Sequence, residues 1–267
     1  MRHVITIASH KGGVGKTTTA LNLAFALSRI RAGVLVVDAD PQGALGITSN
    51  IKKKNTKGLA DIISGRVSAS EAITATRDGK MSMLGIGELS ISDLFKMEEL
   101  AFNGELRNIL QNIIAPFDFV IFDAPAGVGP ITRMLLAIST SVIMPINSKN
   151  TTARSIPLFL KILDEVKNLY NPDLVFDGIV FTMLDYSNPH ELSIKKDLQE
   201  VLPAEIFFET NIIYNPKYEA ASLKGVPIGL LADGKSVARD YNSFAMEVLN
   251  KIVKHESKEE EYVEELF

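Results

Sequence analysis

Residues 9–20 read SHKGGVGKTTTA and form the most specific motif of the chain. An apolar run from His3 to Ala8 precedes it and a helical pattern from Thr18 to Arg29 follows it, so we expect a strand, a glycine-rich loop and a helix in that order. Glycines let the loop backbone approach a phosphate and turn its N–H groups toward the anion. The first turn of the helix adds unpaired donors and a favourable dipole. The stretch therefore predicts a phosphate-binding loop.

The residues after the glycines have individual roles in such a loop. GKT directly before a helix has the spacing of a P-loop, in which Lys16 reaches the β- and γ-phosphates and the Thr17 hydroxyl holds Mg²⁺. An ordinary glycine-rich turn between a strand and a helix is the alternative, and the GKT context disfavours it. The residues expected to bind nucleotide here are Gly12, Gly13, Val14, Gly15, Lys16, Thr17 and Thr18.

An ordinary P-loop does not require the lysine at position 11. KGGVGKTT, residues 11–18, resembles the deviant Walker A box of the ParA/MinD superfamily. The resemblance implies that Lys11 reaches across a dimer interface to the nucleotide of the partner subunit, whereas Lys16 contacts phosphate within its own subunit. Both lysines are expected to take part in catalysis, with ATP and Mg²⁺ as ligands.

Two aspartates follow predicted strands. DADPQG, residues 38–43, follows the apolar run from Val34 and resembles the switch I segment of the superfamily, so Asp40 is expected to orient the attacking water and touch the Mg²⁺ shell. A plain strand-ending turn is the alternative, since Asp, Pro and Gly are turn formers. FDFVIFD, residues 117–123, has a Walker B pattern, in which Asp123 would bind Mg²⁺ through water. Residues 124–129 resemble switch II, with Pro125 where ParA proteins usually have two prolines.

Strand and helix patterns alternate along the whole chain. This alternation predicts a single doubly wound, mostly parallel α/β sheet with helices on both faces. The resemblance implies a P-loop NTPase of SIMIBI-like type. Its predicted extent is residues 1–254, followed by an acidic tail, residues 255–267. Beyond the segments above, strands are expected near 81–87, 141–146, 176–185 and 204–208. Helices are expected near 58–65, 68–74, 92–114 with a break at Gly104, 130–138, 150–168, 188–201 and 237–253.

Composition narrows the function classes. The chain has no cysteine, which excludes disulfides, thiolate nucleophiles and Cys-ligated metal clusters, and its four histidines have no metal-ligand spacing. No signal-peptide pattern and no run of membrane-span length is visible, so a cytoplasmic protein is expected. The resemblance implies that it associates with the nucleoid. The net charge is −4, but residues 256–267 alone carry −5, which leaves the body near +1. A local basic face is therefore compatible with the acidic pI.

The carboxyl-terminal third predicts base and DNA contacts less specifically. By the resemblance, the end of the strand from Phe176 and the segment 210–228 lie near the adenine, which assigns Thr182, Met183 and Asn215 to the nucleotide site. The same segment carries DNA-contacting arginines in ParA proteins. The candidate DNA residues here are Lys217, Lys224, Lys235 and Arg239. Scattered, solvated lysines are an equally good interpretation, because neither periodicity nor clustering decides between the two.

These motifs predict a ParA-type ATPase that forms an ATP-dependent sandwich dimer, binds DNA nonspecifically and positions a plasmid, chromosome or other cargo. The resemblance implies weak intrinsic hydrolysis, stimulated by a ParB-like or other adaptor protein through a basic N-terminal peptide. A MinD- or FlhG-like ATPase acting at a membrane or pole is the alternative. The acidic tail counts against it, because anionic lipid would repel that tail, so no membrane partner is expected. A metabolic P-loop enzyme and a non-catalytic ATP-binding scaffold are further alternatives.

Overall fold

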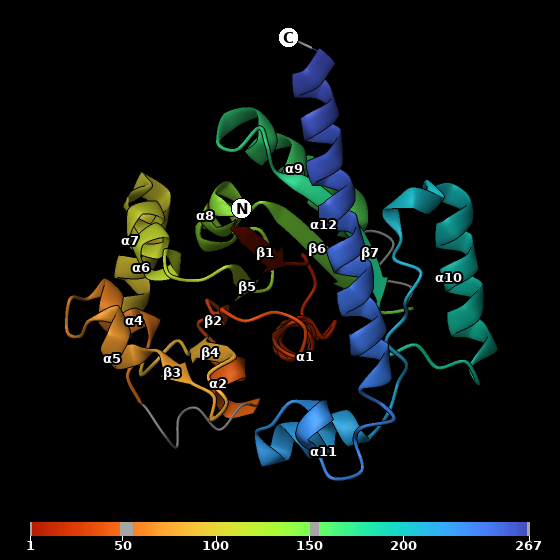
Figure 1. The fold of residues 1–267 in the computed structure, drawn as a ribbon, viewed down its shortest axis with the longest axis horizontal. Coiled ribbons are helices and arrows are strands. Elements are labelled where there is room, and N and C mark those ends of the chain that lie inside the picture. The colour runs from red at the N-terminus through yellow and green to blue at the C-terminus, as the bar shows by residue number, and fades with distance from the viewer. Residues whose placement is uncertain (1, 49–55, 150–154, 266–267) are drawn as a thin grey trace.

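A seven-stranded sheet forms the centre of the protein, as the computed structural model of residues 2–48, 56–149 and 155–265 shows (Figure 1). The strand order is β3-β4-β2-β5-β1-β6-β7. All neighbouring pairs are parallel except β3 with β4, which is antiparallel. The strands are β1 His3–Ile7, β2 Val34–Asp38, β3 Thr74–Ala75, β4 Met81–Leu84, β5 Phe119–Asp123, β6 Ser141–Ile146 and β7 Val175–Phe181.

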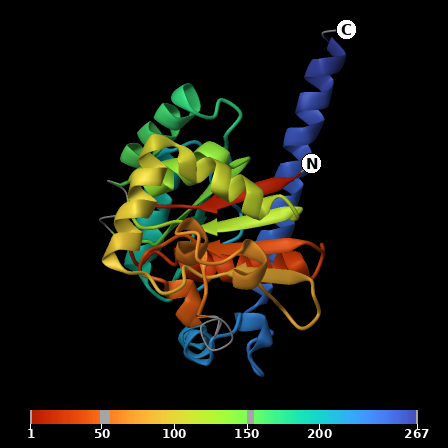
Figure 2. The same ribbon diagram turned by 90° about the vertical axis from the view of Figure 1, so that its left-hand side faces the viewer.

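Helices cover both faces of this sheet (Figures 1 and 2). Successive strand side chains point to opposite faces, so Val4 joins one core and Ile5 the other. α1 and α12 pack on the Ile5 face, and α6 to α9 pack on the Val4 face. The helices are α1 Lys16–Ser28, α2 Ala44–Thr48, α4 Leu59–Ile63, α5 Ala69–Ala72, α6 Ile91–Asn103, α7 Glu105–Ile114, α8 Pro130–Ile138, α9 Ser155–Leu169, α10 Pro189–Val201, α11 Lys217–Lys224 and α12 Arg239–Glu265.

The predicted fold class is confirmed. Strands β2 and β5 are buried along their whole length, as expected of apolar strands in a parallel sheet covered on both sides. The break at Gly104 also occurs, because this residue takes φ 85° between α6 and α7. Residues 150–154 of the predicted helix 150–168 lie outside the described residues, and α9 begins at Ser155.

Other element predictions were wrong or incomplete. The strand expected at 204–208 is a 3₁₀ turn, Ala204–Ile206, and in this segment only Phe207 bridges to β7, at Ile179. Pro203 precedes the turn and lacks the N–H that a ladder needs. The short elements α2, β3 and α11 were not predicted. α12 runs twelve residues past the predicted end at Val253 and is continuous across the predicted domain boundary at residue 254.

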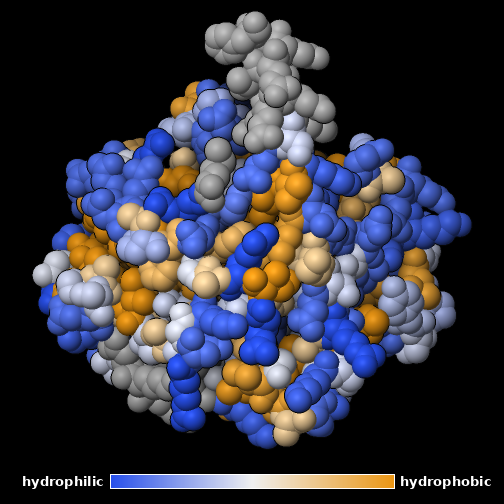
Figure 3. All heavy atoms as spheres, viewed as in Figure 1, coloured by the Kyte–Doolittle hydropathy of each residue, from blue (hydrophilic) through white to orange (hydrophobic). Residues whose placement is uncertain are grey.

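The surface is mixed in character. On the face seen in Figure 3, apolar side chains emerge in separate patches between hydrophilic ones. The carboxyl-terminal part of α12 projects beyond the sheet and its covering helices (Figure 1). Among the described residues, none of the helices has the length and apolar character needed to cross a membrane.

Candidate nucleotide site

Three strand ends meet at the glycine-rich loop. Asp123 at the end of β5 is in register with Ile7 of β1 on one side and with Asp38 of β2 on the other. The loop, residues 8–15, leaves β1 at this edge and enters α1. Ligands of doubly wound sheets bind at such carboxyl ends of strands. The predicted strand, loop and helix are therefore all present and stand where a ligand site is expected.

The loop has the backbone that its glycines permit. Gly13 and Gly15 have φ of 70° and 81°, a left-handed conformation that side chains with a Cβ rarely adopt. Gly15 is the residue before α1, and its carbonyl accepts the Thr19 N–H at 2.8 Å. Gly12 and Gly13 are exposed, whereas Val14 is completely buried and fixes the middle of the loop. The backbone is thus open to a ligand on one side and held to the core on the other.

Lys16 lies below this loop as a buried cation. It is 7% exposed, and burial lowers its pKa, while the charges of Asp123 and Asp40 act in the opposite direction. Asp40 is half-buried, and its Oδ1 accepts the Gln42 N–H at 2.9 Å. Lys16, Asp40 and Asp123 therefore act on one another electrostatically, as the sequence analysis expects of a single site.

Two carboxyls at this edge are completely buried. Burial raises the pKa of Asp123 well above its ordinary value, with the charge of Asp38 as the second cause. Burial likewise raises the pKa of Asp38 to about 7, against hydrogen bonds from the backbone N–H groups of Asp40, Gly46 and Leu45. When ionised, the pair would carry an excess of negative charge, which a bound cation would compensate.

The residues present fit a magnesium ion. Within the described ranges, no donor lies at the distance and angle of a hydrogen bond from either carboxylate oxygen of Asp123. The Thr17 hydroxyl lies close enough to Asp123 to favour its ionised form. Hydroxyl and carboxylate oxygens are the hard ligands that Mg²⁺ prefers, usually together with waters and substrate phosphates. Thr17, Asp40 and Asp123 supply such oxygens at one place.

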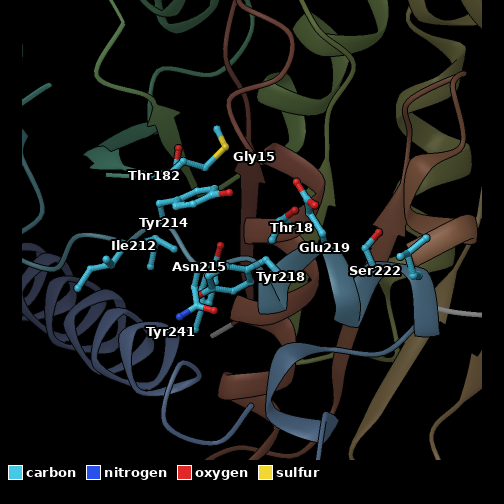
Figure 4. A pocket seen from close by; sticks show the side chains of 13 residues that line it. Gly15, Thr18, Thr182, Ile212, Tyr214, Asn215, Tyr218, Glu219, Ser222 and Tyr241 are labelled. Atoms are coloured by element: carbon cyan, nitrogen blue, oxygen red, sulfur yellow. The ribbon is translucent and has the colours of Figure 1, made fainter. Parts of the chain in front are cut away.

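A cavity of about 450 Å³ adjoins the loop (Figure 4). It contains Gly15 and Thr18 from the loop and the first turn of α1, together with the predicted residues Thr182, Met183 and Asn215. Met183 has φ 54°, the one positive φ among the described non-glycine residues. Asn215 Oδ1 accepts the Lys217 N–H at 3.0 Å, which leaves the amide NH₂ group as a donor.

Thr182 connects the cavity to the loop. Its hydroxyl lies within hydrogen-bond distance of two buried carbonyls, Val14 O at 2.7 Å and Ile146 O at 2.9 Å. The end of β7 is thereby held against the loop after β1, although 168 residues separate Thr182 from Val14. A side chain on one wall of the cavity thus positions the loop on the other.

Other residues of this cavity were missed by the sequence analysis. Figure 4 shows several of them around the same hollow. They come from the segment after β7, from α11 and from the start of α12. The first two belong to the segment 210–228, which the resemblance placed near the adenine without singling out these residues, whereas no motif marks the start of α12. Tyr241 also reaches α1, where its hydroxyl lies 3.2 Å from Thr19 Oγ1. The missed lining residues are Ile212, Ile213, Tyr214, Tyr218, Glu219, Ser222, Leu223 and Tyr241.

The four candidate DNA residues lie on α11, the following loop and the start of α12. Lys217 forms an ion pair with Asp233 at 3.1 Å and also donates to the Asp233 carbonyl at 2.8 Å. Lys224, Lys235 and Arg239 are exposed. Lys11 is half-buried at the loop. A DNA contact and a role for Lys11 in a second subunit both stay predictions.

The chain is similar in sequence to a known protein family and to several curated proteins. The AAA domain model AAA_31 matches residues 2–176. The chromosome partitioning protein ParA of Myxococcus xanthus is 29% identical over 87% of this chain and 82% of that protein. The sporulation initiation inhibitor protein Soj of Bacillus subtilis is 27% identical over 93% and 98%.

Solved structures share the fold. A cobyrinic acid a,c-diamide synthase from Mycobacterium smegmatis with bound ADP and magnesium has a TM-score of 0.75 and 27% identity, over 93% of this chain and 94% of that one. The septum site-determining protein MinD of Pyrococcus horikoshii, complexed with Mg-ADP, has a TM-score of 0.75 and 22% identity over 93% and 96%. Because the family model covers more than half of the chain, the protein belongs to the AAA domain family AAA_31 and is a P-loop ATPase of the ParA/MinD type.

Proposed function

We propose that this protein is a Mg²⁺-dependent ATPase that works as a ParA-type dimer switch. The observation that carries the proposal is the pair of lysines in one phosphate loop. Lys16 is buried among carboxylates and Lys11 stands five residues before it at the rim of the loop. One lysine suffices to bind phosphate in an ordinary P-loop. The second would reach a nucleotide bound by another copy of the chain.

The nucleotide would lie along the loop with its base in the adjoining cavity. Residues 12–18 would surround the phosphates, and Thr182, Met183 and Asn215 would lie by the base. The bound ADP or ATP analogue and magnesium named for the Mycobacterium smegmatis synthase structures, 27% and 26% identical to this chain, support this ligand pair. Mg²⁺ would be held by Thr17, Asp40 and Asp123, and it would supply neutralisation of phosphate charge.

Hydrolysis would depend on residues from two subunits. Asp40 would orient the attacking water, and its fixed Oδ1 contact with the Gln42 N–H suits a positioning role. Lys11 of the opposite subunit would stabilise charge that develops on the transferred phosphate, as an arginine finger does. A site that is incomplete in one subunit would turn over slowly by itself. Slow turnover suits a timed switch that an adaptor protein accelerates.

The dimer would bind DNA through phosphate contacts. Lys224, Lys235 and Arg239 are exposed and lie on neighbouring segments, whereas Lys217 is already paired with Asp233. The names of the ParA relatives from Myxococcus xanthus and Caulobacter vibrioides support chromosome or other cargo partitioning as the purpose. Binding of this kind falls steeply with salt, because lysine and arginine displace counterions from DNA.

Two substitutions test the switch. Lys16→Gln should abolish binding of a fluorescent ATP analogue, because the buried phosphate-binding cation is gone. Lys11→Ala should keep most of that binding but lose phosphate release and ATP-dependent dimerisation in sedimentation experiments. The exposed Lys80→Ala is the matched control and should behave as the unmodified protein. Normal hydrolysis by Lys11→Ala would refute the role of Lys11 across the dimer.

A second function has one specific observation in its favour. The cobyrinic acid a,c-diamide synthase structure covers nearly the whole chain at 27% identity. A synthase of that kind would consume ATP only with its carboxylic acid substrate. ADP formation that depends on added cobyrinic acid and an ammonia donor would establish this function. ATP turnover that responds to dimerisation alone supports the switch.

A further inference from the structure

Residues 124–129 form a loop that lies against the phosphate loop. We call it the β5–α8 loop, because it connects these two elements. Its Gly127 N–H donates to the Ser9 carbonyl at 3.3 Å. A Cβ placed on Gly12 would lie 3.8 Å from the Ala126 Cβ, so the exposed rim of the phosphate loop faces the β5–α8 loop at contact distance. The position of the β5–α8 loop therefore sets the shape of the site beside Gly12.

The backbone around Val128 has the freedom to take several conformations. Gly127 has φ 94°, and Gly129 follows Val128 directly. Glycine populates backbone conformations that other residues avoid, so these two glycines allow the Val128 peptide to swing. Val128 is half-buried and Gly129 is exposed. Contacts with neighbouring side chains, rather than local conformational preference, must hold this part of the loop in place.

Arg133 of α8 makes such a contact. Its Nε donates to the Val128 carbonyl at 3.2 Å, and its Nη2 donates to Glu165 Oε2 of α9 at 2.9 Å. A guanidinium presents its N–H groups in fixed directions, so the bond to Glu165 orients the group that holds Val128. One side chain thus fastens the end of the β5–α8 loop to a neighbouring helix. A lysine ammonium lacks this fixed fork and would reach one acceptor at the expense of the other.

Positioning explains the Arg133 contact better than stability does. The side chains of Arg133 and Glu165 are 33% and 37% exposed, and ion pairs at such exposure contribute little to the free energy of unfolding. Arg66 offers a comparison, since it also bridges two acceptors, Asp61 of α4 and Asp93 of α6. Those acceptors are side chains on helices. Arg133 instead holds a backbone carbonyl of the loop that lies beside the phosphate site.

We propose that Arg133 is a positioning residue for the nucleotide site, and this role rests on the ATPase function proposed above. Arg133 holds the β5–α8 loop against the phosphate loop, while Glu165 keeps the guanidinium in the required orientation. It acts through Val128 and Gly127 and is not a catalytic residue. No motif of the sequence marks it, because its two acceptors lie on different elements.

Loss of this contact should affect hydrolysis more than nucleotide binding. Without Arg133, the β5–α8 loop moves away from Gly12, which directly follows Lys11, the residue proposed to stabilise charge during hydrolysis. Lys16, by contrast, is buried in the first turn of α1 and remains in place to bind phosphate. The turnover number kcat should therefore fall while nucleotide affinity changes little, a division that general destabilisation does not produce.

Hydrogen exchange of the full chain without nucleotide tests the contact itself. Arg133→Gln and Arg133→Lys should each make exchange of the β5–α8 loop amides about tenfold faster. Glu165→Gln keeps an acceptor for the guanidinium, so its effect should be smaller, about threefold. Arg66→Lys is the matched control, because it removes the same fork from a distant ion-pair network, and it should leave exchange in this loop unchanged. Unchanged circular dichroism confirms that the variants fold.

Kinetics test the consequence for the nucleotide site. In both Arg133 variants, kcat for phosphate release with Mg²⁺ should fall about tenfold, whereas the Kd of the fluorescent ATP analogue should change less than about threefold. Arg66→Lys should keep both values. If the unmodified protein releases no phosphate, the ATPase proposal fails, and the exchange measurement still decides whether Arg133 holds the loop.

Three outcomes would overturn the role of Arg133. One is unchanged exchange of the β5–α8 loop in both Arg133 variants. Another is full recovery of exchange protection and turnover in Arg133→Lys, which would assign the effect to the ion pair with Glu165 alone. The third is a loss of turnover in Arg66→Lys as large as that in Arg133→Lys, which would show that general loosening of the fold is the cause.

Discussion

Asp38 and Asp123 are register partners at the ends of the neighbouring strands β2 and β5, and both are completely buried. Burial is the largest cause that raises the pKa of both carboxyls; the charge of Asp38 adds to it for Asp123, and the charge of Asp40 adds to it for Asp38. Lys16 offsets this charge only in part, because burial also lowers its own pKa. The site therefore disfavours the ionised form of both carboxyls next to a loop shaped for phosphate, and a bound divalent cation would favour that form.

Asp38→Asn should stabilise the protein at neutral pH when Mg²⁺ is absent. The folded pKa of about 7 lies above the ordinary 3.8, so the folded state holds a proton that the unfolded state releases. Stability is therefore lost as pH rises from about 4 to 7 and stays low above that range. Asparagine removes the effect and keeps a side-chain acceptor for the backbone N–H groups. The gain is at most ~4 kcal/mol.

Urea unfolding at about pH 5 and pH 8 measures this gain, which should be larger at the higher pH. Asp173→Asn, at an exposed position, is the control and should give the same small change at both pH values. An Asp38→Asn variant that loses stability at pH 8 would show that its carboxylate is stabilised by an unrecognised contact.

Thr182→Val should loosen the phosphate loop. The Thr182 hydroxyl shares one proton between the carbonyls of Val14 and Ile146, and both contacts are buried. Valine keeps the shape but leaves the carbonyls without that donor, which costs about 1 to 3 kcal/mol. Binding of the ATP analogue should weaken as well, because Val14 belongs to the loop.

Thr182→Ser is the matched variant, since it keeps the hydroxyl and loses only a methyl group. In urea unfolding and in titrations with the ATP analogue, Thr182→Ser should be more stable and bind the analogue more tightly than Thr182→Val. Equal affinity in Thr182→Val and Thr182→Ser would mean that the contact with Val14 supports the fold but not the loop.

Gly58→Ala should be strongly destabilising. Gly58 precedes α4, where a Cβ would overlap the backbone of Gly85 and lie 2.5 Å from the Cα of Gly87. The start of α4 cannot move away from residues 85–87 without losing a hydrogen bond, because the Leu59 N–H donates to the Gly85 carbonyl at 2.9 Å. Forced overlap with backbone should cost about 3 kcal/mol.

The control for this steric effect is Gly129→Ala. Gly129 has φ −66°, and a Cβ there would meet nothing within 4 Å, so thermal unfolding should change little. If Gly58→Ala unfolds at the temperature of the unmodified protein, α4 must be free to move away from residues 85–87.

The sequence was most informative where the structure depends on residues that are close together in the chain. Residues 9–20 predicted strand, loop and helix correctly, because glycine spacing and apolar periodicity act within a few residues. The motif around Asp40 identified that residue as part of the site. The sequence did not predict that Asp38 is buried beside Asp123, because this contact depends on the pairing of two strands that are distant in the sequence. The contact of Tyr241 with Thr19 spans 222 residues and has no local signal at all. The false strand at 204–208 arose because an apolar pattern was given more weight than Pro203.

His255→Ala should weaken the attachment of the projecting part of α12. The carboxyl of Asp177 in β7 is completely shielded from solvent, and His255 Nε2 lies 3.3 Å from its Oδ1. Lys251 nearby donates to the Asp177 backbone carbonyl at 2.7 Å rather than to the carboxylate. Removing the histidine leaves the buried side chain of Asp177 without this close polar neighbour, which should cost about 1 to 3 kcal/mol. Hydrogen exchange should become faster in the α12 backbone near residue 255, while Lys254→Ala, at an exposed neighbouring position, should leave exchange unchanged. Equal exchange in the two variants would show that packing of α12 through Ile252, and not the contact with Asp177, holds this end of the helix to the sheet.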